Sequence, residues 1–334
     1  MAPFLGRFSS MWQLIHLSRR LQATDPRDKW FAFAGLLDVL RPDYGKSVAQ
    51  VYTAVTKYFL DQGCIDIWEF LDDEDTRLDL PSWVIDMSHT GPDILTNAFV
   101  TGGAFLYGLS HRLSPESVPV YLVDKICELV APQHGFLSDE LSMPPDGAKP
   151  FDLTDADFRQ LEIELLCNAK HFAAILLALP AGEMYITGEG MKQALFRTTI
   201  CDTDVVDAPI SESLSGAFLA YYDRQVALIM SEYNPAMLLN LKAVFIISLS
   251  DSFKQKFETL TSKRQFMASE RGLIGWVPRR ARRVDHICIM PGARLPYIIR
   301  EHGEDYKLIG HSYVHGLMDE MVSAETGEPV ERLK

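Results

Sequence analysis

Histidines near the C-terminus are the residues of this sequence best suited to chemistry. Imidazole exchanges protons near neutral pH, and carboxylates or a tyrosine beside it can tune or extend that exchange. Four of the nine histidines, His286, His302, His311 and His315, crowd into this region, together with acidic residues. The pattern predicts an acid–base site with five candidate catalytic residues: Asp285, His286, His311, Tyr313 and His315.

His311, Tyr313 and His315 alternate along the chain. In a β-strand this spacing places three side chains on one face, and Asp285 with His286 is expected on a neighbouring strand. The alternative is structural, with His315 only securing the local backbone. A metal site would need three or four converging ligands, which this spacing does not favour, so neither a metal nor a cofactor is expected.

Four further residues are candidates for substrate binding. Trp83 and Asp86 could line a pocket, although core packing also explains Trp83. Trp276 is a second aromatic candidate, and Arg264 could stabilise developing negative charge. Ser82 lacks the flanking glycines of a hydrolase nucleophile, and the glycines at 182–190 lack the lysine of a phosphate loop. Hydrolase and nucleotide-dependent activities are therefore not expected.

The formal net charge of −13 disfavours nucleic acid and anionic membranes as partners. We expect a small-molecule ligand or a protein partner instead, and the oligomeric state stays open. One basic cluster departs from this balance, and it is read either as a solvated loop or as a site for an anion or an acidic partner. It consists of Arg279, Arg280, Arg282 and Arg283.

The five cysteines are odd in number and widely spaced, which indicates neither disulfides nor a zinc finger and fits a reducing compartment. No signal peptide is recognisable, and the longest apolar run, 172–180, is far shorter than the roughly 20 residues of a membrane span. A cytoplasmic location is therefore predicted.

Capping residues and apolar periodicity predict a series of helices that position these candidates. Thr24 or Asp25 should cap the first helix, and Ser47 should cap the second. A surface loop is expected at 132–150. The remaining predicted helices cover 118–130, 154–180, 191–199, 214–231 and 235–260.

After residue 260 the pattern changes to short β-rich runs separated by glycine turns. These runs occupy 264–268, 273–277, 285–290, 296–300 and 306–310. The predicted fold is α+β, with a mainly helical body at 1–260 and a small antiparallel β-barrel or curled sheet at 261–322. Residues 323–334 are expected to be a frayed tail.

Six segments of the chain, in order, resemble landmarks of the fungal heterokaryon-incompatibility (HET) family. They read TDPRDK at 24–29, PDYGKSV at 42–48, LPSWV at 80–84, FRTT at 196–199 followed by Asp202, GLIGWVP at 272–278 and YVHG at 313–316. The resemblance corresponds to the C-terminal two-thirds of such proteins, and the N-terminal segment that marks the family's effector core has no counterpart here.

The resemblance implies a HET-like regulatory or recognition module without the effector core, so NAD cleavage and cell death are not expected of it. The alternative is a cofactor-independent enzyme of cyclase or isomerase type in fungal secondary metabolism. Such an enzyme needs only a shaped pocket and a few proton-transfer groups.

Overall fold

The computed structural model describes residues 15, 22–35, 41–71, 80–88, 120–132, 155–202, 212–231, 253, 257, 260, 264–290, 293, 295–318 and 329–330. The chain forms two compact units, which interleave in the sequence. The first holds residues 1–124, 284–312 and 318–334, and the second holds 125–283 and 313–317. The predicted division of the chain at residue 260 stays a prediction.

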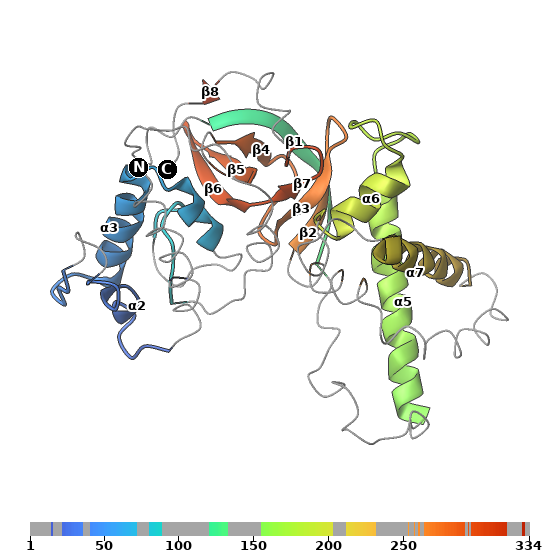
Figure 1. Ribbon diagram of the computed structural model, residues 1–334, viewed down its shortest axis with the longest axis horizontal. Helices are drawn as coiled ribbons and strands as arrows, with labels where there is room; N and C mark the ends of the chain where they lie inside the picture. Colours follow the sequence, from blue (N-terminus) through green and yellow to red (C-terminus); the bar gives the residue numbers. More distant parts are fainter. Residues whose placement is uncertain are drawn as a thin grey trace. The chain divides into compact units, whose positions relative to one another are not determined.

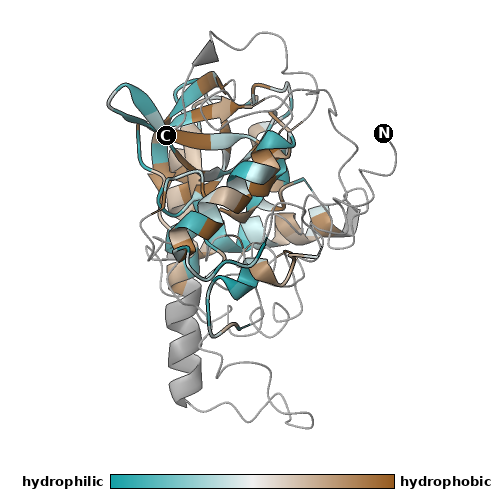
Figure 2. Ribbon diagram, turned by 90° about the vertical axis from the view of Figure 1, so that its left-hand side faces the viewer, coloured by the Kyte–Doolittle hydropathy of each residue, from teal (hydrophilic) through white to brown (hydrophobic). Residues whose placement is uncertain are grey.

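The helices of the first unit are α2 (Asp28–Phe31), α3 (Val48–Asp61) and the 3-10 helix η1 (Ile65–Phe70) (Figure 1). Ser47 caps α3 as predicted: its side chain accepts from the Gln50 N–H, while the Gln50 side chain accepts from the Ser47 N–H. The buried residues of α3 are Val51, Tyr52, Val55, Thr56, Phe59 and Leu60. On the side where α2 and α3 lie, hydrophilic and hydrophobic residues share the helical ribbons (Figure 2), as expected of helices with one buried face.

The first helix does not begin as predicted. Its N-cap residue is Arg27, whose side chain makes no capping hydrogen bond. Asp25 instead accepts the backbone N–H of Arg27 at 3.0 Å and binds its guanidinium. The other guanidinium N–H groups reach the carbonyls of Tyr44 and Lys46, both at 2.7 Å. Asp25 therefore holds an arginine that ties the loop before α3 to α2.

The described strands of the first unit are β4 (His286–Ile289), β5 (Tyr297–His302), β6 (Asp305–His311), the first half of β1 (Val120–Val130) and the short β8 (Pro329–Val330). β4 pairs with β5 and β5 with β6, all antiparallel, while β8 pairs with the start of β1. The core lies between these strands and the helices, and Trp68 of η1 packs edge-on against Tyr297 of β5.

The helices of the second unit are α5 (Asp155–Ala178), α6 (Met191–Thr199) and α7 (Glu212–Ser231). The predicted bounds of α6 are confirmed, and those of α7 differ by two residues at its start. Aromatic rings from several segments form the core between α5 and α7, in a cluster made of Phe172, Phe196, Phe218, Tyr221, Phe253 and Phe257.

The strands of the second unit are the second half of β1, β2 (Arg264–Ser269), β3 (Ile274–Pro278) and β7 (Tyr313–Val314), paired in that order. β7 lies so close to β3 that a Cβ at Gly275 would overlap the carbonyl oxygen of Tyr313. Glycine is therefore required where these two backbones meet.

The helix predicted at 118–130 is wrong, because the structure forms strand β1 there. Its apolar spacing suits a helix, but β1 is rich in Val, Ile and Tyr and gains hydrogen bonds on both sides. Seven of the described strands follow one open path from β6 through β1 to β7, and β8 pairs with β1 off this path. The predicted combination of helices with an antiparallel sheet is thus confirmed. The predicted mainly helical composition and the predicted closed barrel are not confirmed.

Several predictions lie outside the described residues. These are nearly all of the loop at 132–150, the first residue of the predicted helix at 154–180, most of the helix at 235–260, and nearly all of the tail. Among the residues that the structure describes, no helix combines the length and apolar character needed to cross a membrane.

Candidate functional site

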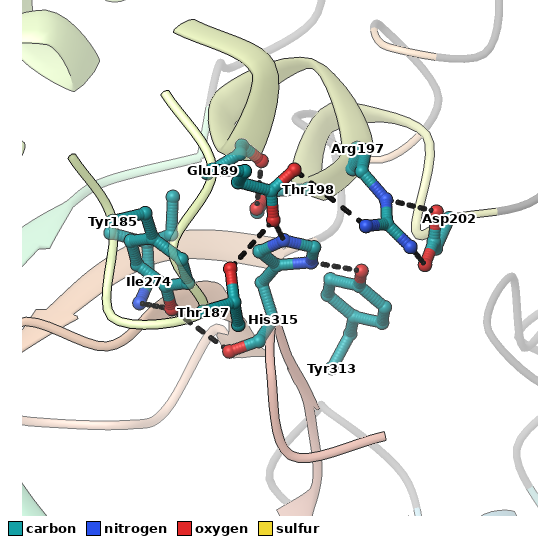
Figure 3. A network of polar contacts seen from close by, with 10 residues as sticks. Tyr185, Thr187, Glu189, Arg197, Thr198, Asp202, Ile274, Tyr313 and His315 are labelled. Carbon is teal, nitrogen blue, oxygen red and sulfur yellow. Dashed lines mark hydrogen bonds and ion pairs between the residues drawn. The ribbon is translucent and has the colours of Figure 1, made fainter. Parts of the chain in front are cut away.

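His315 is the centre of a polar network within the second unit (Figure 3). Its Nε2 lies 2.6 Å from Glu189 Oε1, and its Nδ1 lies 3.1 Å from the Tyr313 hydroxyl. A carboxylate only accepts, so we assign the proton to Nε2; with a neutral ring, Nδ1 then accepts from the Tyr313 O–H. Both nitrogens are thus engaged inside the protein, and only 3% of the residue is exposed.

Tyr185 fastens the backbone around this imidazole. Its hydroxyl donates to the His315 carbonyl at 2.8 Å and accepts from the Ile274 N–H at 3.1 Å. Its ring lies against the imidazole with the centroids 5.2 Å apart. Burial raises the pKa of Tyr185 to about 12, so the hydroxyl keeps its proton as a donor at neutral pH.

Glu189 connects His315 to a second ion pair. Its Oε1 also accepts from the Thr187 hydroxyl at 2.8 Å, and its Oε2 lies 3.6 Å from an Arg197 nitrogen. Partial burial by itself would raise the pKa of Glu189, but the hydrogen bonds from His315 and Thr187 outweigh it and lower that pKa below its ordinary value. Glu189 is therefore a carboxylate at neutral pH.

Arg197 closes the network at the end of α6. Its guanidinium binds Asp202 through two N–H groups, the Nε at 2.7 Å, and this carboxylate raises the pKa of Arg197. Cys201 and Asp202 adopt positive φ of 52° and 58°, and the Asp202 N–H donates to the Arg197 carbonyl. Non-glycine residues rarely adopt this conformation, so the turn is held in place by these bonds.

The network joins residues that are far apart in sequence. Tyr313 and His315 were predicted candidates, and Arg197 with Asp202 belongs to one of the segments that resemble the HET family. Tyr185, Thr187 and Glu189 were missed. The glycine-rich run around them was considered only as a phosphate loop, and the glutamate between Gly188 and Gly190 was the signal available there.

The predicted strand face of alternating residues is wrong. His311 ends β6, while Tyr313 begins β7 and His315 stands in the turn after it. Ser312 separates the strands because its N–H and hydroxyl both bond the carbonyl of Pro296. Tyr313 and His315 nevertheless meet through their side chains.

Asp285 and His286 lie in the first unit, as does His311, whereas the residues of the network lie in the second unit. The Arg300 guanidinium donates to both carboxylate oxygens of Asp285, at 2.7 and 2.8 Å. His286 Nε2 lies 2.8 Å from Glu301. The strand beside β6 is β5, not β4, so the predicted adjacency of Asp285–His286 to the strand of His311 is also wrong.

The four substrate-binding candidates occupy separate places. Trp83 packs at the edge of the first unit's core and its carbonyl accepts from the Trp68 indole N–H, while Asp86 is buried and accepts from Ser88. Trp276 and Arg264 are buried on β3 and β2 of the second unit. The Trp276 indole N–H donates to the Thr198 carbonyl at 2.8 Å, which joins β3 to the end of α6.

Within the described parts of the chain, no group of three or more His, Cys, Asp or Glu side chains is arranged to hold a metal ion. No curated protein and no solved structure matches the chain. Residues 220–329 match the family of the Het-6 beta-barrel domain. The matched stretch begins within α7 and includes β2 to β6, β7 and the start of β8. This match supports a relationship to the HET family.

Proposed function

We propose that the protein is a HET-like regulatory or recognition module that presents the loop at 182–190 to a protein partner. The observation that carries this proposal is the exposure of Met184 and Ile186, 62% and 58%, on either side of the buried Tyr185. Large apolar side chains exposed together on a loop are typical of sites where another protein binds.

The loop is held in one conformation by its own backbone. Met184 and Gly190 form an antiparallel bridge, and the Tyr185 N–H donates to the Glu189 carbonyl at 2.7 Å. The Gly188 N–H donates back to the Tyr185 carbonyl at 2.9 Å, in a turn where Gly188 has φ 86°. A loop that is already ordered loses little conformational entropy on binding, so its apolar side chains can contribute most of their burial energy.

The polar network supports a scaffolding role for His315 rather than proton transfer to a substrate. Both ring nitrogens have partners in the protein, and the same network fixes Tyr185 and Glu189 within the exposed loop. His315 therefore holds the loop that Met184 and Ile186 occupy.

The finer parts of the proposal rest on the family resemblance. These parts are the fungal origin, the cytoplasmic location and the choice of a protein as the partner. The alternative of a cofactor-independent cyclase or isomerase in fungal secondary metabolism would instead use Asp285, His286 and His311, or Tyr313 with His315, as acids and bases.

Photo-crosslinking from the loop tests the proposal. A photoreactive residue replaces Met184 in one protein and Met230 in a control, because Met230 is a similarly exposed methionine on α7. We expect one partner protein to crosslink at position 184 and not at position 230. With that partner purified, M184S/I186S should weaken binding by about tenfold or more, since each buried apolar side chain contributes about 1.5–3 kcal/mol.

Equal crosslinking at both positions, or unchanged affinity of the double variant, would contradict the loop as the recognition surface. Turnover of a small molecule by the purified protein that is lost in His315→Asn, at an unchanged melting temperature, would favour the enzyme instead.

A further inference from the structure

The loop at 182–190 is a short β-hairpin, and one edge of it faces away from the opposite arm. Hydrogen bonds of 2.7 and 2.8 Å flank the bridge between Met184 and Gly190, one on each side of this pair. Met184 and Gly190 are therefore a pair that exchanges no hydrogen bonds, so the N–H and C=O of Met184 point away from the opposite arm. We call this side of the hairpin the open edge (residues 184–186).

The open edge carries hydrogen-bonding groups that the protein itself does not use. Within the part of the chain that the structure describes, the backbone N–H and C=O of Met184 and of Ile186 have no hydrogen-bond partner. Both residues are exposed. Backbone groups left at the edge of a strand are a template on which another extended chain can pair.

Side chains of the hairpin alternate between the protein and the solvent. Tyr185 is buried with its ring against the imidazole of His315 (Figure 3). Met184 and Ile186, on either side of it, are exposed. This alternation is that of an extended chain, so Met184 and Ile186 share the outward face. A strand added at the open edge would therefore place every second side chain beside these two apolar residues.

The open edge is short and lacks the usual protection. It lies between Pro180 and the turn at Gly188, which has φ 86°. Natural proteins commonly block an exposed edge with charged side chains or proline, and the sequence Met-Tyr-Ile at 184–186 has neither. The open edge therefore suits an added strand of a few residues.

The charge near the open edge disfavours an acidic segment. Glu183, next to Met184, is exposed, and its carboxylate has no ion-pair partner within the described chain. The whole protein has a formal net charge of −13. An acidic strand would be repelled, whereas lysine or arginine beside its apolar residues would be attracted.

From these observations we infer that the protein partner contributes an extended apolar segment flanked by basic residues, which pairs as an added strand with the backbone of Met184 and Ile186. The inference rests on the proposed function and names how the loop at 182–190 is recognised. In this mode of recognition, main-chain hydrogen bonds give affinity and alternate side chains give specificity. The ordered hairpin lowers the entropic cost of the pairing.

Two replacements of Ile186 separate backbone pairing from apolar contact. Ile186 is the second residue of the β-turn in which the Gly188 N–H donates to the Tyr185 carbonyl, a position that favours proline. Ile186→Pro removes the N–H, while Ile186→Val keeps it beside an apolar side chain with the same number of carbons. An added strand should therefore bind I186P more weakly than I186V, at similar melting temperatures.

Fluorescence anisotropy on the full chain measures the binding of short labelled peptides. The probe alternates valine and threonine and carries lysine at each end. Its control has the same sequence with every amide N-methylated, which removes the N–H groups needed for pairing. We expect the probe to bind and the N-methylated peptide not to bind. I186P should bind the probe about two- to tenfold more weakly than I186V, the effect of one hydrogen bond.

The outcomes distinguish this inference from the proposed function. Weak binding to M184S/I186S with equal affinities for I186P and I186V would leave the loop as an apolar recognition surface and overturn the strand pairing. Equal binding of the N-methylated peptide, no binding of the probe, or tighter binding when glutamate replaces its terminal lysines would also overturn the inference. So would a dimer of the chain that Ile186→Pro dissociates, because the open edge would then pair with a second copy.

Discussion

His315 and Glu189 are 126 residues apart in sequence, yet their side chains meet at 2.6 Å in the second unit. This contact joins the turn after β7 to the loop before α6. Because the Glu189 carboxylate also faces Arg197 and the Thr187 hydroxyl, one side chain links the exposed loop, the helix end and the sheet.

Replacement of His315 should reveal its structural role. In His315→Ala the Glu189 carboxylate and the buried Tyr313 hydroxyl both lose a partner, so we expect the free energy of unfolding to fall by about 2–4 kcal/mol. Urea denaturation measures this change. His302→Ala, at the exposed end of β5, is the control and should behave as the wild type. A His315→Ala protein as stable as this control would refute the role.

Glu189 should make stability depend on acid pH. Because the folded-state pKa of Glu189 lies below its ordinary value of 4.5, its stabilising contribution is complete above that pH and is lost as the pH falls through the folded pKa. The stability difference between the wild type and Glu189→Gln should therefore be largest near neutrality and shrink below pH 4.5. Urea midpoints across acid pH measure it, with the exposed Glu183→Gln as control. A difference that stays constant into acid would count against this account.

One substitution should act in opposite directions at two glycines. Gly275→Ala places a methyl group against the Tyr313 carbonyl, so β7 must move away from β3. We expect a loss of at least about 3 kcal/mol, since backbone atoms at a strand pair cannot yield as a side chain can. Gly216→Ala, in open space on α7, should instead stabilise by about 0.5–1 kcal/mol because alanine favours helix. Equal effects at both positions would disprove the close contact.

Arg27 should resist even conservative replacement. Its planar guanidinium serves Asp25 and the carbonyls of Tyr44 and Lys46 together, which the single ammonium of lysine cannot reproduce. Arg27→Lys should therefore lower the melting temperature almost as much as Arg27→Ala does. Arg41→Lys, the same change at an exposed position of this unit, should leave the melting temperature unchanged. A fully stable Arg27→Lys protein would show that charge alone suffices.

The sequence by itself determined features that depend on a few neighbouring residues. Ser47 predicts the N-cap of α3, and the residues of α6 predict its bounds, because both depend on contacts within one helical turn. Gly272 and Gly303 mark the β-turns because positive φ favours glycine. The β-rich character of the C-terminal region follows from the same local preferences.

Only the tertiary structure decided which distant segments meet. Residues 120–130 became β1 because partner strands from other parts of the chain offer hydrogen bonds that outweigh a helix-like apolar spacing. The grouping of His315 with Glu189 and Arg197 within the second unit, and the place of Asp285 and His286 in the first unit, follow from which unit each segment joins. The density of histidines along the sequence does not predict which residues meet, because side chains far apart in the chain are brought together by the packing of whole elements.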